Sequence, residues 1–240
     1  MEIHLYALCW NEEKMLPYFF KHYDNIVDQY YIYDNYSTDN SISILRSHPK
    51  VIMNRFKIQG DSMILSTQHM HNQFWKQSKV DWIITCNMDE HLYHPNLRGY
   101  LQDCTYSGIT IIESEGYDMV SDSFPNSDQP LYESIKVGVR TPFYDMTNIF
   151  NPTEIKDINF SVGRHEANPV GNVKKTIKNE VKLLHYKFLG FDYFNSRLSE
   201  LKSGLRKTDI AKQWGDHYLW DERKKLQVFE SVKKRAVKVL

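Results

Sequence analysis

The sequence of 240 residues has few cysteines, no net charge and no long hydrophobic run. Its three cysteines, Cys9, Cys86 and Cys104, are too few and too scattered to build a disulfide framework or a zinc cage. This cysteine usage favours a reducing compartment. The 30 Lys and Arg residues are balanced by 30 Asp and Glu residues, so the chain lacks the basic excess that a nucleic-acid-binding surface usually requires.

Signals for export and for membrane insertion are also missing. Residues 1–6 lack the basic start and the long apolar core of a signal peptide, and no apolar run approaches the roughly 20 residues of a membrane-spanning helix. We therefore expect a cytoplasmic protein. The basic C-terminal segment 223–235 leaves open a peripheral contact with the inner face of a membrane, although a solvated helix face is the plainer interpretation.

The first half of the chain does contain a regular alternation of strand and helix patterns. Strands are expected at 3–9, 29–33, 51–53 and 80–85, and helices from Asn11 to Tyr23, at 41–47 and at about 62–78. Such alternation predicts right-handed crossovers. The predicted architecture is α/β, with a Rossmann-like, mostly parallel central sheet and helices on both faces.

The second half has a different pattern. A strand is expected at 108–113, a polar loop at 116–130, two short β-like pieces within 148–160 and a strand at 181–185. Residues 191–240 are predicted to be helical, with interruptions near Gly204 and at Trp214-Gly215. We therefore expect one domain at 1–190 and a helical C-terminal extension at 191–240 that packs on it.

Polar side chains follow three of the expected strands at their carboxyl ends: Asn11-Glu12, the segment 34–39 and the segment 87–90. In a parallel sheet these ends meet at one edge, where α/β proteins bind their ligands. Carboxylate and amide groups there suit a nucleobase and a ribose, and Asp89 suits a divalent cation. Any one cluster has a simpler interpretation as a helix cap or an Asx turn. Their joint placement favours a binding site.

In their order and spacing these clusters resemble the family-2 nucleotide-sugar glycosyltransferases, which have the GT-A fold. Asn11-Glu12 resembles the NE pair after the first strand of that family, residues 34–39 resemble its nucleotide-binding turn, and residues 87–90 resemble its DxD metal motif in a DxDE variant. Segments at 149–152, 163–165 and 183–187 resemble a bacterial subgroup met among surface-polysaccharide genes. The resemblance covers roughly residues 3–220.

The resemblance implies an inverting transfer of a sugar from a nucleoside-diphosphate donor to a hydroxyl of a glycan or a lipid-linked acceptor. Residues 1–100 would form the donor half and residues 101–190 the acceptor half. Mn²⁺ or Mg²⁺ would bind to Asp89 and His185. Donor-binding roles would fall on Asn11, Glu12, Asp34, Asp39, Asn72, Asn87, Glu90, Arg164 and His165.

Two positions depart from the family pattern. Asn87 replaces the usual first aspartate, which removes one charge and weakens the expected metal affinity, and Tyr36 replaces a glycine. An inverting reaction also needs a carboxylate base near the acceptor. The segment 113–118 offers candidates, of which Asp118 is favoured and Glu115 comes second.

Two alternatives remain open from the sequence. A nucleotidyltransferase would share the sheet and the metal carboxylates, but it would want a glycine-rich, basic loop after the first strand, and residues 9–12 are acidic and contain no glycine. A non-catalytic nucleotide- or carbohydrate-binding module is the second alternative. The donor sugar, the acceptor and the oligomeric state are not specified by these patterns.

Overall fold

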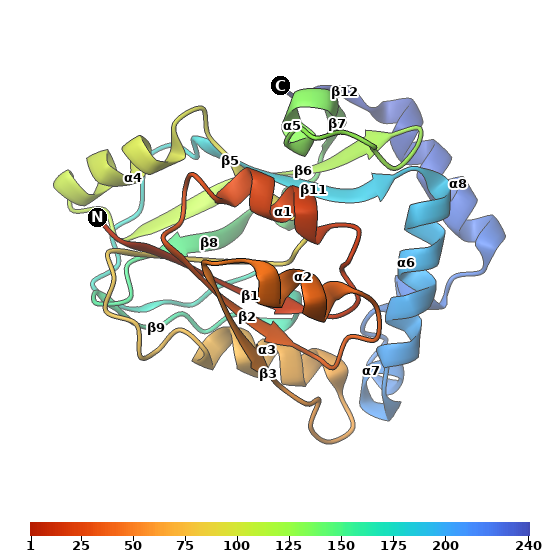
Figure 1. Cartoon of the computed structure of the whole chain (residues 1–240), viewed down its shortest axis with the longest axis horizontal. Helices are drawn as coiled ribbons and strands as arrows, with labels where there is room; N and C mark the ends of the chain where they lie inside the picture. Colours follow the sequence, from red (N-terminus) through yellow and green to blue (C-terminus); the bar gives the residue numbers. More distant parts are fainter.

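The computed structural model describes residues 1–240, and its main feature is one sheet of ten strands flanked by helices (Figure 1). Four parallel strands form its first part, in the order β3–β2–β1–β4. Their bounds are β1 Ile3–Cys9, β2 Gln29–Asp34, β3 Val51–Arg55 and β4 Trp82–Cys86. The predicted α/β architecture with a parallel central sheet is therefore confirmed.

The second part of the sheet mixes directions. Strand β8 (Met146–Phe150) runs antiparallel to both β4 and β6 (Ile111–Ser121), and β7 (Val137–Arg140) runs antiparallel to β6. Strand β11 (Val181–Leu189) pairs with β6 in parallel and with β5 (Glu90–Tyr93) in the antiparallel sense. Two short strands, β9 (Ile155–Asp157) and β10 (Val170–Gly171), form a separate ribbon. Because β5 follows β4 directly, β11 is brought beside the end of β4.

Helices connect the strands of the main sheet. They are α1 Leu16–Tyr23, α2 Ser41–Ser47, α3 Met63–Gln73, α4 Leu97–Tyr106 and α5 Leu131–Ser134, with 3₁₀ turns η1 Pro142–Tyr144 and η2 Val162–Arg164. Among all the helices of the chain, none combines the length and apolar character that crossing a membrane requires. The three cysteines are buried and unpaired.

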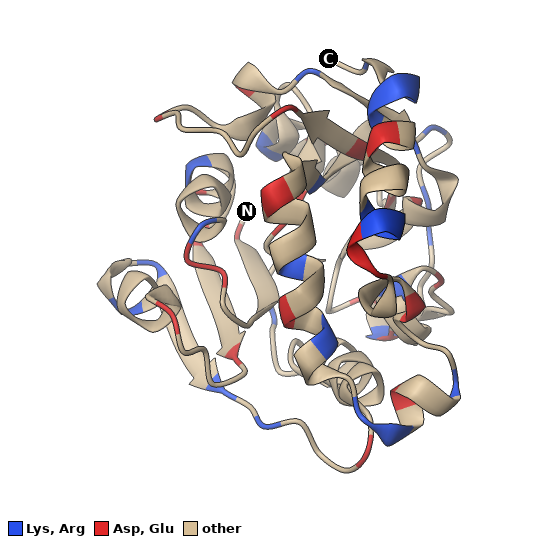
Figure 2. Cartoon of the chain, turned by 90° about the vertical axis from the view of Figure 1, so that its right-hand side faces the viewer, with Lys and Arg blue, Asp and Glu red and all other residues tan.

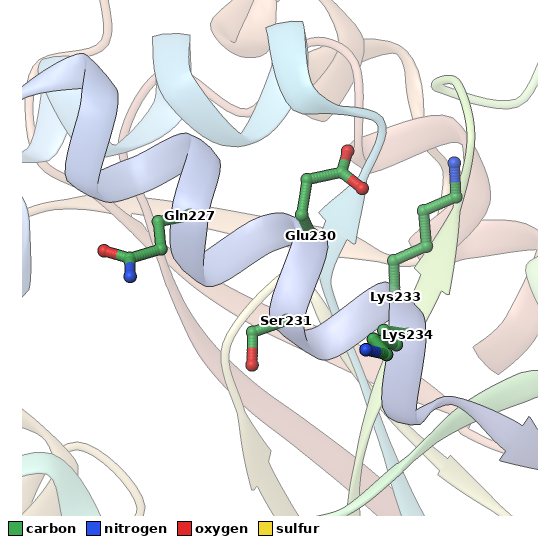
Figure 3. A pocket seen from close by; sticks show the side chains of 5 residues that line it. All are labelled: Gln227, Glu230, Ser231, Lys233 and Lys234. Atoms are coloured by element: carbon green, nitrogen blue, oxygen red, sulfur yellow. The ribbon is translucent and has the colours of Figure 1, made fainter.

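The C-terminal extension contains α6 Phe191–Gly204, α7 Lys207–Ala211, η3 Asp216–Leu219, α8 Glu222–Arg235 and β12 Val237–Lys238. Helix α6 packs against β11 and η3, while α8 packs against α6, β6 and β7. Strand β12 then joins the edge of the main sheet beside β7. Lys and Arg alternate with Asp and Glu along this side of the molecule (Figure 2). The outer side of α8 carries only an open hollow with no hydrophobic lining (Figure 3).

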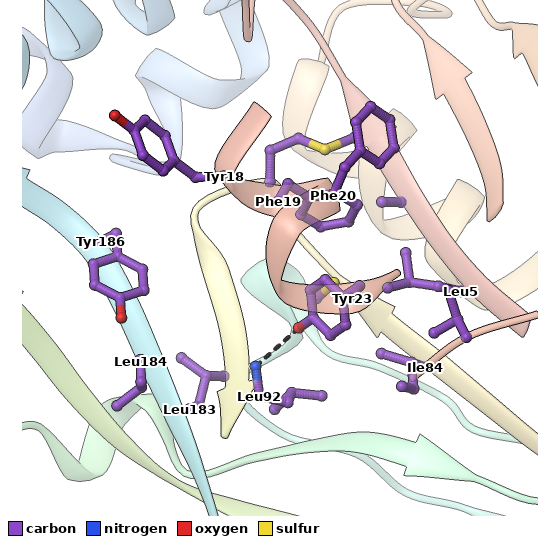
Figure 4. Close-up of a cluster of buried hydrophobic side chains, with 14 of the residues drawn as sticks. Leu5, Tyr18, Phe19, Phe20, Tyr23, Ile84, Leu92, Leu183, Leu184 and Tyr186 are labelled. Carbon is purple, nitrogen blue, oxygen red and sulfur yellow. Dashed lines mark hydrogen bonds between the residues drawn. The ribbon is translucent and has the colours of Figure 1, made fainter. Parts of the chain in front are cut away.

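The core divides into clusters on the two faces of the sheet. Leu5 of β1 lies in the larger cluster beneath α1, and its neighbour Tyr6 lies in a smaller cluster with Trp75, as strand alternation requires. Within the larger cluster the Tyr23 hydroxyl accepts a hydrogen bond from the Leu92 backbone N–H at 2.9 Å (Figure 4). This bond fixes α1 to β5 and thereby to the turn that precedes β5.

Two local predictions were wrong, and one helix was missed. Helix α1 begins at Leu16, because Asn11 adopts a positive φ of 54° that takes the chain out of a helical path. Residues 116–121, expected in a loop, continue strand β6. Helix α4 was not predicted, although Leu97, Leu101 and Cys104 bury one of its faces.

Candidate active site

The carboxyl ends of β1, β2 and β4 lie at one edge of the sheet. Cys9 of β1 stands opposite Asp34 of β2, and Ala7 of β1 stands opposite Cys86 of β4. The polar segments that follow these strands therefore emerge at the same edge. This confirms the spatial reasoning behind the predicted clusters, since residues far apart in the sequence lie on one rim.

His185 lies beside the turn that follows β4, between two carboxylates. Strand β11 places it opposite Asp118 of β6 on one side and Glu90 of β5 on the other. Its Nδ1 lies 2.8 Å from Asp118 Oδ1, and its Nε2 lies 3.4 Å from Asp89 Oδ2. The imidazole side chain is 7% exposed. Asp89, His185 and Asp118 thus form one ionic group, with a carboxylate at each ring nitrogen, which is called the carboxylate–histidine triad below.

The two carboxylates fix the charge of this histidine. Burial opposes protonation of His185, but Asp89 and Asp118 outweigh it and raise the pKa of the imidazole to about 10. Burial would likewise raise the pKa of Asp89, yet the imidazolium of His185, with help from Arg197, holds that pKa well below its ordinary value. At neutral pH the triad carries a buried imidazolium between two carboxylate groups.

Asn87 and Glu90 shape the turn that carries Asp89. The Glu90 carboxylate accepts hydrogen bonds from the Asn87 backbone N–H at 2.8 Å and from the Asn87 side chain at 3.1 Å. It also forms a buried ion pair with Arg164. Both carboxylate oxygens of Glu90 are therefore engaged inside the protein, which favours a structural role over the predicted contact with the donor. The exposed Asn87 keeps its side-chain oxygen free.

Arg164 and His165 were predicted together as donor-binding residues, and the structure separates them. Arg164 is buried with φ 62° and donates to Glu90 and to the Thr85 carbonyl, the latter at 3.1 Å. It lies behind the turn and is shielded from ligands. His165 lies at the surface, with Nδ1 3.0 Å from the Phe143 carbonyl and its ring 3.7 Å from the Phe143 ring.

The first two predicted clusters hold each other in place. Asn11 Oδ1 accepts from the Thr38 backbone N–H at 2.7 Å. Asp39 accepts from the Glu13 backbone N–H at 3.0 Å, and the fully buried Asp34 accepts from the Ser37 backbone N–H at 3.2 Å. The loops after β1 and β2 are therefore joined by side-chain caps of backbone N–H groups. Asp39 still lines the pocket described next.

Helix α6 closes a polar pocket against these loops. Arg197 forms an ion pair with Glu12 and donates to the Trp10 carbonyl at 3.0 Å, while Asn11 Nδ2 donates to Glu200 at 2.7 Å. The pocket has a volume of about 220 Å³. Its lining residues are Asn11, Glu12, Glu13, Lys14, Asp39, Tyr193, Ser196, Arg197 and Glu200. Burial raises the pKa of Glu12 to about 8, against the opposing charge of Arg197.

Sequence reasoning missed the contribution of α6. Arg197 and Glu12 are 185 residues apart, and no local pattern links them. The acidic character of residues 11–13 hinted at a basic partner, but it did not identify one. Tyr144 was also missed, although its ring lies 4.3 Å from that of His185.

The remaining predicted residues have mixed outcomes. The Asn72 side chain accepts a hydrogen bond from the Phe160 backbone N–H at 2.8 Å and donates one to the Phe160 carbonyl at 3.2 Å, so it faces away from the rim. Glu115 lies on the face of β6 opposite Asp118, because strand side chains alternate, and it accepts from the Tyr117 hydroxyl at 3.1 Å. Asp118 lies in the triad itself, with its second oxygen 3.0 Å from the Thr141 hydroxyl.

Two of these groups suit a divalent cation. The protein contains no group of three or more His, Cys, Asp or Glu side chains that together hold a metal ion. Asp89 Oδ2 and His185 Nε2 are nevertheless 3.4 Å apart, a separation compatible with two ligands of one ion. Asp118 on the other ring nitrogen is the outer carboxylate that such histidines commonly have. The residues therefore fit a half-site whose other ligands would come from substrate and water.

Comparison with known proteins gives no direct match, since neither a family model nor a curated protein matches the chain. Among solved structures, S. aureus TarS 1–349 is 11% identical, with 95% of this chain and 69% of that chain covered at a TM-score of 0.46. Its complex with UDP gives 11% identity, 95% and 70% coverage and a TM-score of 0.48. Its complex with UDP-GlcNAc is 11% identical, with 98% of this chain and 72% of that chain covered at a TM-score of 0.45. Likenesses with TM-scores below 0.5 establish neither a common fold nor a common ligand.

Proposed function

We propose that the protein is a glycosyltransferase that moves a sugar from a nucleoside diphosphate to a hydroxyl acceptor. One observation carries this proposal: the carboxylate–histidine triad and the polar pocket under α6 share the edge formed by the carboxyl ends of β1, β2 and β4. Nucleotide-binding α/β sheets use this edge. The resemblance to family-2 glycosyltransferases with the GT-A fold points to the same site.

The nucleoside would occupy the pocket between the donor loops and α6. A volume of about 220 Å³ is below the usual range for whole ligands, so it suits one part of an extended donor. The side chains of Asp39 and Glu200 offer oxygens that accept hydrogen bonds from base N–H and ribose O–H groups, and Glu12, whose pKa is raised to about 8 by burial, can also donate one. Arg197 acts on the charge of Asp89, so the pocket leads toward the triad. The diphosphate would lie along that path.

Asp89 and His185 would hold Mn²⁺ or Mg²⁺. When bound, such an ion neutralises the negative charge that develops on the leaving diphosphate. His185 would release its Nε2 proton in order to hold the ion through that nitrogen, and its Nδ1 proton would stay donated to Asp118. Residue 87 is an asparagine, and the Glu90 carboxylate is paired with Arg164. Asp89 is therefore the one carboxylate of this turn that faces outward.

Asp118 is the proposed base, acting through Oδ2. The Thr141 hydroxyl lies 3.0 Å from Asp118 Oδ2 and 3.0 Å from the Val139 carbonyl, so its single proton is shared between them. Oδ2 is thus the less committed oxygen. In the proposed step the acceptor oxygen bonds to the anomeric carbon, its proton passes to Asp118, and the bond to the phosphate oxygen breaks on the opposite side. The anomeric configuration would be inverted.

A glycan or lipid-linked acceptor in surface-polysaccharide assembly is proposed from the family resemblance alone. The alternative of a non-catalytic binding module explains the pocket, but it gives no reason for an imidazolium held between two carboxylates beside it. Keeping such charges out of water is costly unless they act. A nucleotidyltransferase would want basic, glycine-containing phosphate loops, and the loop after β1 has neither property.

Thermal unfolding in the presence of nucleotides tests the proposal. UDP, GDP and dTDP are titrated with and without Mn²⁺, and a true ligand at 100 times its Kd stabilises the fold by about 2.7 kcal/mol. We expect one of the three to raise the melting temperature, and Mn²⁺ to increase that shift. A protein that none of the three stabilises would not be a nucleotide-sugar glycosyltransferase.

A further inference from the structure

Lys187 is a partly buried cation without a partner. It lies on β11 two residues beyond His185, and its ammonium makes no hydrogen bond or ion pair within the chain. Its Nζ lies 5.9 Å from the centroid of the Phe188 ring. Every other lysine or arginine that is shielded from solvent to this degree donates a hydrogen bond or forms an ion pair. Shielding an unpaired ammonium costs free energy unless a ligand compensates it.

Lys187 lies on the strand that carries His185 of the triad. The pairing of β11 with β6 shifts register between His185 and Phe188, so the irregularity falls within the segment that contains Lys187. Bulges beside active sites commonly re-aim a side chain. Burial lowers the pKa of Lys187, and the charges of Asp118 and Asp89 oppose this shift, so the ammonium lies within the field of both carboxylates. It is not close enough to either for an ion pair.

The C-terminal extension adds two polar groups beside Lys187. His217 and Tyr218 of η3 have their rings 4.1 Å apart. Burial, together with the charges of Lys187 and His185, lowers the pKa of His217 to about 3 and keeps its imidazole neutral. Burial, together with the charge of Asp89, raises the pKa of Tyr218 to about 12. Gly215 permits this placement, because it has φ 74° and a side chain there would meet the Tyr218 ring at 2.9 Å. Neither the His217 nor the Tyr218 side chain has a hydrogen-bond partner in the protein, and both are only partly exposed.

We propose that Lys187, His217 and Tyr218 form a binding subsite for the diphosphate of the donor, in which η3 of the C-terminal extension supplies two of the three groups. This inference rests on the proposed function and assigns part of it to a segment outside the predicted donor half. An ammonium, an imidazole N–H and a phenol O–H are all donors that suit phosphate oxygens. As the bond between the sugar and the phosphate oxygen breaks, the electron pair stays on that oxygen. Lys187 keeps its proton and stabilises the new charge.

Binding of inorganic pyrophosphate, measured by calorimetry, tests the subsite without knowledge of the nucleobase. Lys187→Gln should weaken pyrophosphate binding about 10- to 100-fold, the loss expected for one charge-assisted hydrogen bond. Lys187→Arg should retain most of it, and His217→Gln should cause a smaller loss. Lys212→Gln changes an exposed lysine at the end of α7 and is the matched control. The nucleoside diphosphate that binds best and its parent nucleoside are measured in parallel.

The outcomes are distinct. If Lys187→Gln weakens pyrophosphate and the nucleoside diphosphate but leaves the nucleoside unchanged, the subsite is supported. Its unliganded melting temperature should be equal to or above that of the wild type, because an unpaired charge has been removed. If wild type and Lys187→Gln bind pyrophosphate equally, or wild type does not bind it, the subsite is wrong. If pyrophosphate binds through Lys187 but no nucleoside diphosphate binds, the subsite stands and the glycosyltransferase proposal fails.

Discussion

Two buried histidine environments lie close together in this protein, and their imidazoles differ in charge: one is cationic and the other is neutral. His185 of β11 sits between Asp89 and Asp118, which outweigh burial and raise its pKa to about 10. His22 of α1 and His91 of β5 stack at 4.7 Å between ring centroids within the aromatic core, and burial lowers the pKa of His22 to about 4. His91 stands opposite Leu184, the residue before His185.

The difference shows what a buried charge requires. His22 and His91 have no carboxylate partner, so they stay neutral and serve as flat packing groups; both ring nitrogens of His91 are without hydrogen bonds. His185 keeps its charge because two acids were placed around it. Burying three ionisable groups together brings little stability over an apolar core. The triad is therefore better explained by chemistry than by folding.

Breaking the support behind the triad should have the largest effect. Glu90→Ala leaves Arg164 charged and unpaired in the interior, and we expect a loss of about 3–5 kcal/mol in the free energy of unfolding. Urea unfolding measures it. Asp157→Ala removes a partly exposed ion pair with Lys76 and should cost about 1 kcal/mol or less. Equal losses in the two variants would show that Glu90 does not hold the turn.

Asp89→Asn tests the triad as a reacting group. Loss of this charge should lower the rate of sugar transfer about 100- to 1000-fold, the range seen when one transition-state charge stabiliser is removed. Nucleoside-diphosphate release from the donor, measured at saturating donor, reports the rate. Asp122→Asn, which changes an exposed carboxylate, is the control and should retain full activity. A rate for Asp89→Asn within a factor of about three of the wild type would contradict the proposed role.

Acid should destabilise the core pair of His22 and His91 and leave His185 charged. The folded state resists protonation of His22 while the unfolded chain protonates near 6.5, so stability should fall by about 3 kcal/mol between pH 6.5 and pH 4. His185 has the opposite sign: its contribution is fully present below pH 6.5 and is lost as pH rises toward 10. Chemical denaturation across pH measures both. His22→Gln should flatten the acid limb alone, and an unchanged acid limb would count against a neutral buried His22.

The variant with the smallest expected effect, Thr141→Val, tests whether Asp118 acts as the base or only positions His185. Thr141→Val removes the hydroxyl beside Asp118 Oδ2 and should cost about 1 kcal/mol of stability. If Asp118 Oδ2 takes the proton from the acceptor hydroxyl, the rate of sugar transfer in Thr141→Val should stay at or above the wild-type rate, because Oδ2 no longer shares a hydrogen bond with Thr141. Steady-state kinetics compare the sugar-transfer rate of Thr141→Val with that of Asp118→Asn, which should lose activity. A Thr141→Val rate as low as that of Asp118→Asn would assign Asp118 to positioning His185.

The parallel part of the fold could be predicted because its information is local. Apolar runs such as 3–9 and 82–86 mark buried strands, and the rule for strand ends then places Asp34, Asp39 and Asp89 on one rim. His185 was found by a motif of the family, and the structure does bring it to Asp89.

The wrong and missed site residues are those whose position depends on contacts between distant parts of the chain. Nothing near Glu12 in the sequence specifies Arg197, and the burial of Arg164 depends on Glu90, 74 residues away. Glu115 was the second candidate for the base, and a loop was expected to begin at Gly116; β6 instead continues to Ser121, which leaves Glu115 on the face of the strand opposite Asp118. In α4 the signal was present, since Asn96 caps the helix, and it was overlooked.

The central claim is that the carboxylate–histidine triad is the donor site, and NMR of the imidazole nitrogens tests it most directly. Spectra of wild type and His185→Gln identify the His185 signals, which are then followed at pH 8 with and without the nucleoside diphosphate that stabilises the fold. The account predicts a charged His185 in the free protein and a change in its signals on binding, while His22 and His91 stay neutral and unchanged. A neutral His185 in the free protein, or signals that the nucleotide leaves unmoved, would contradict it.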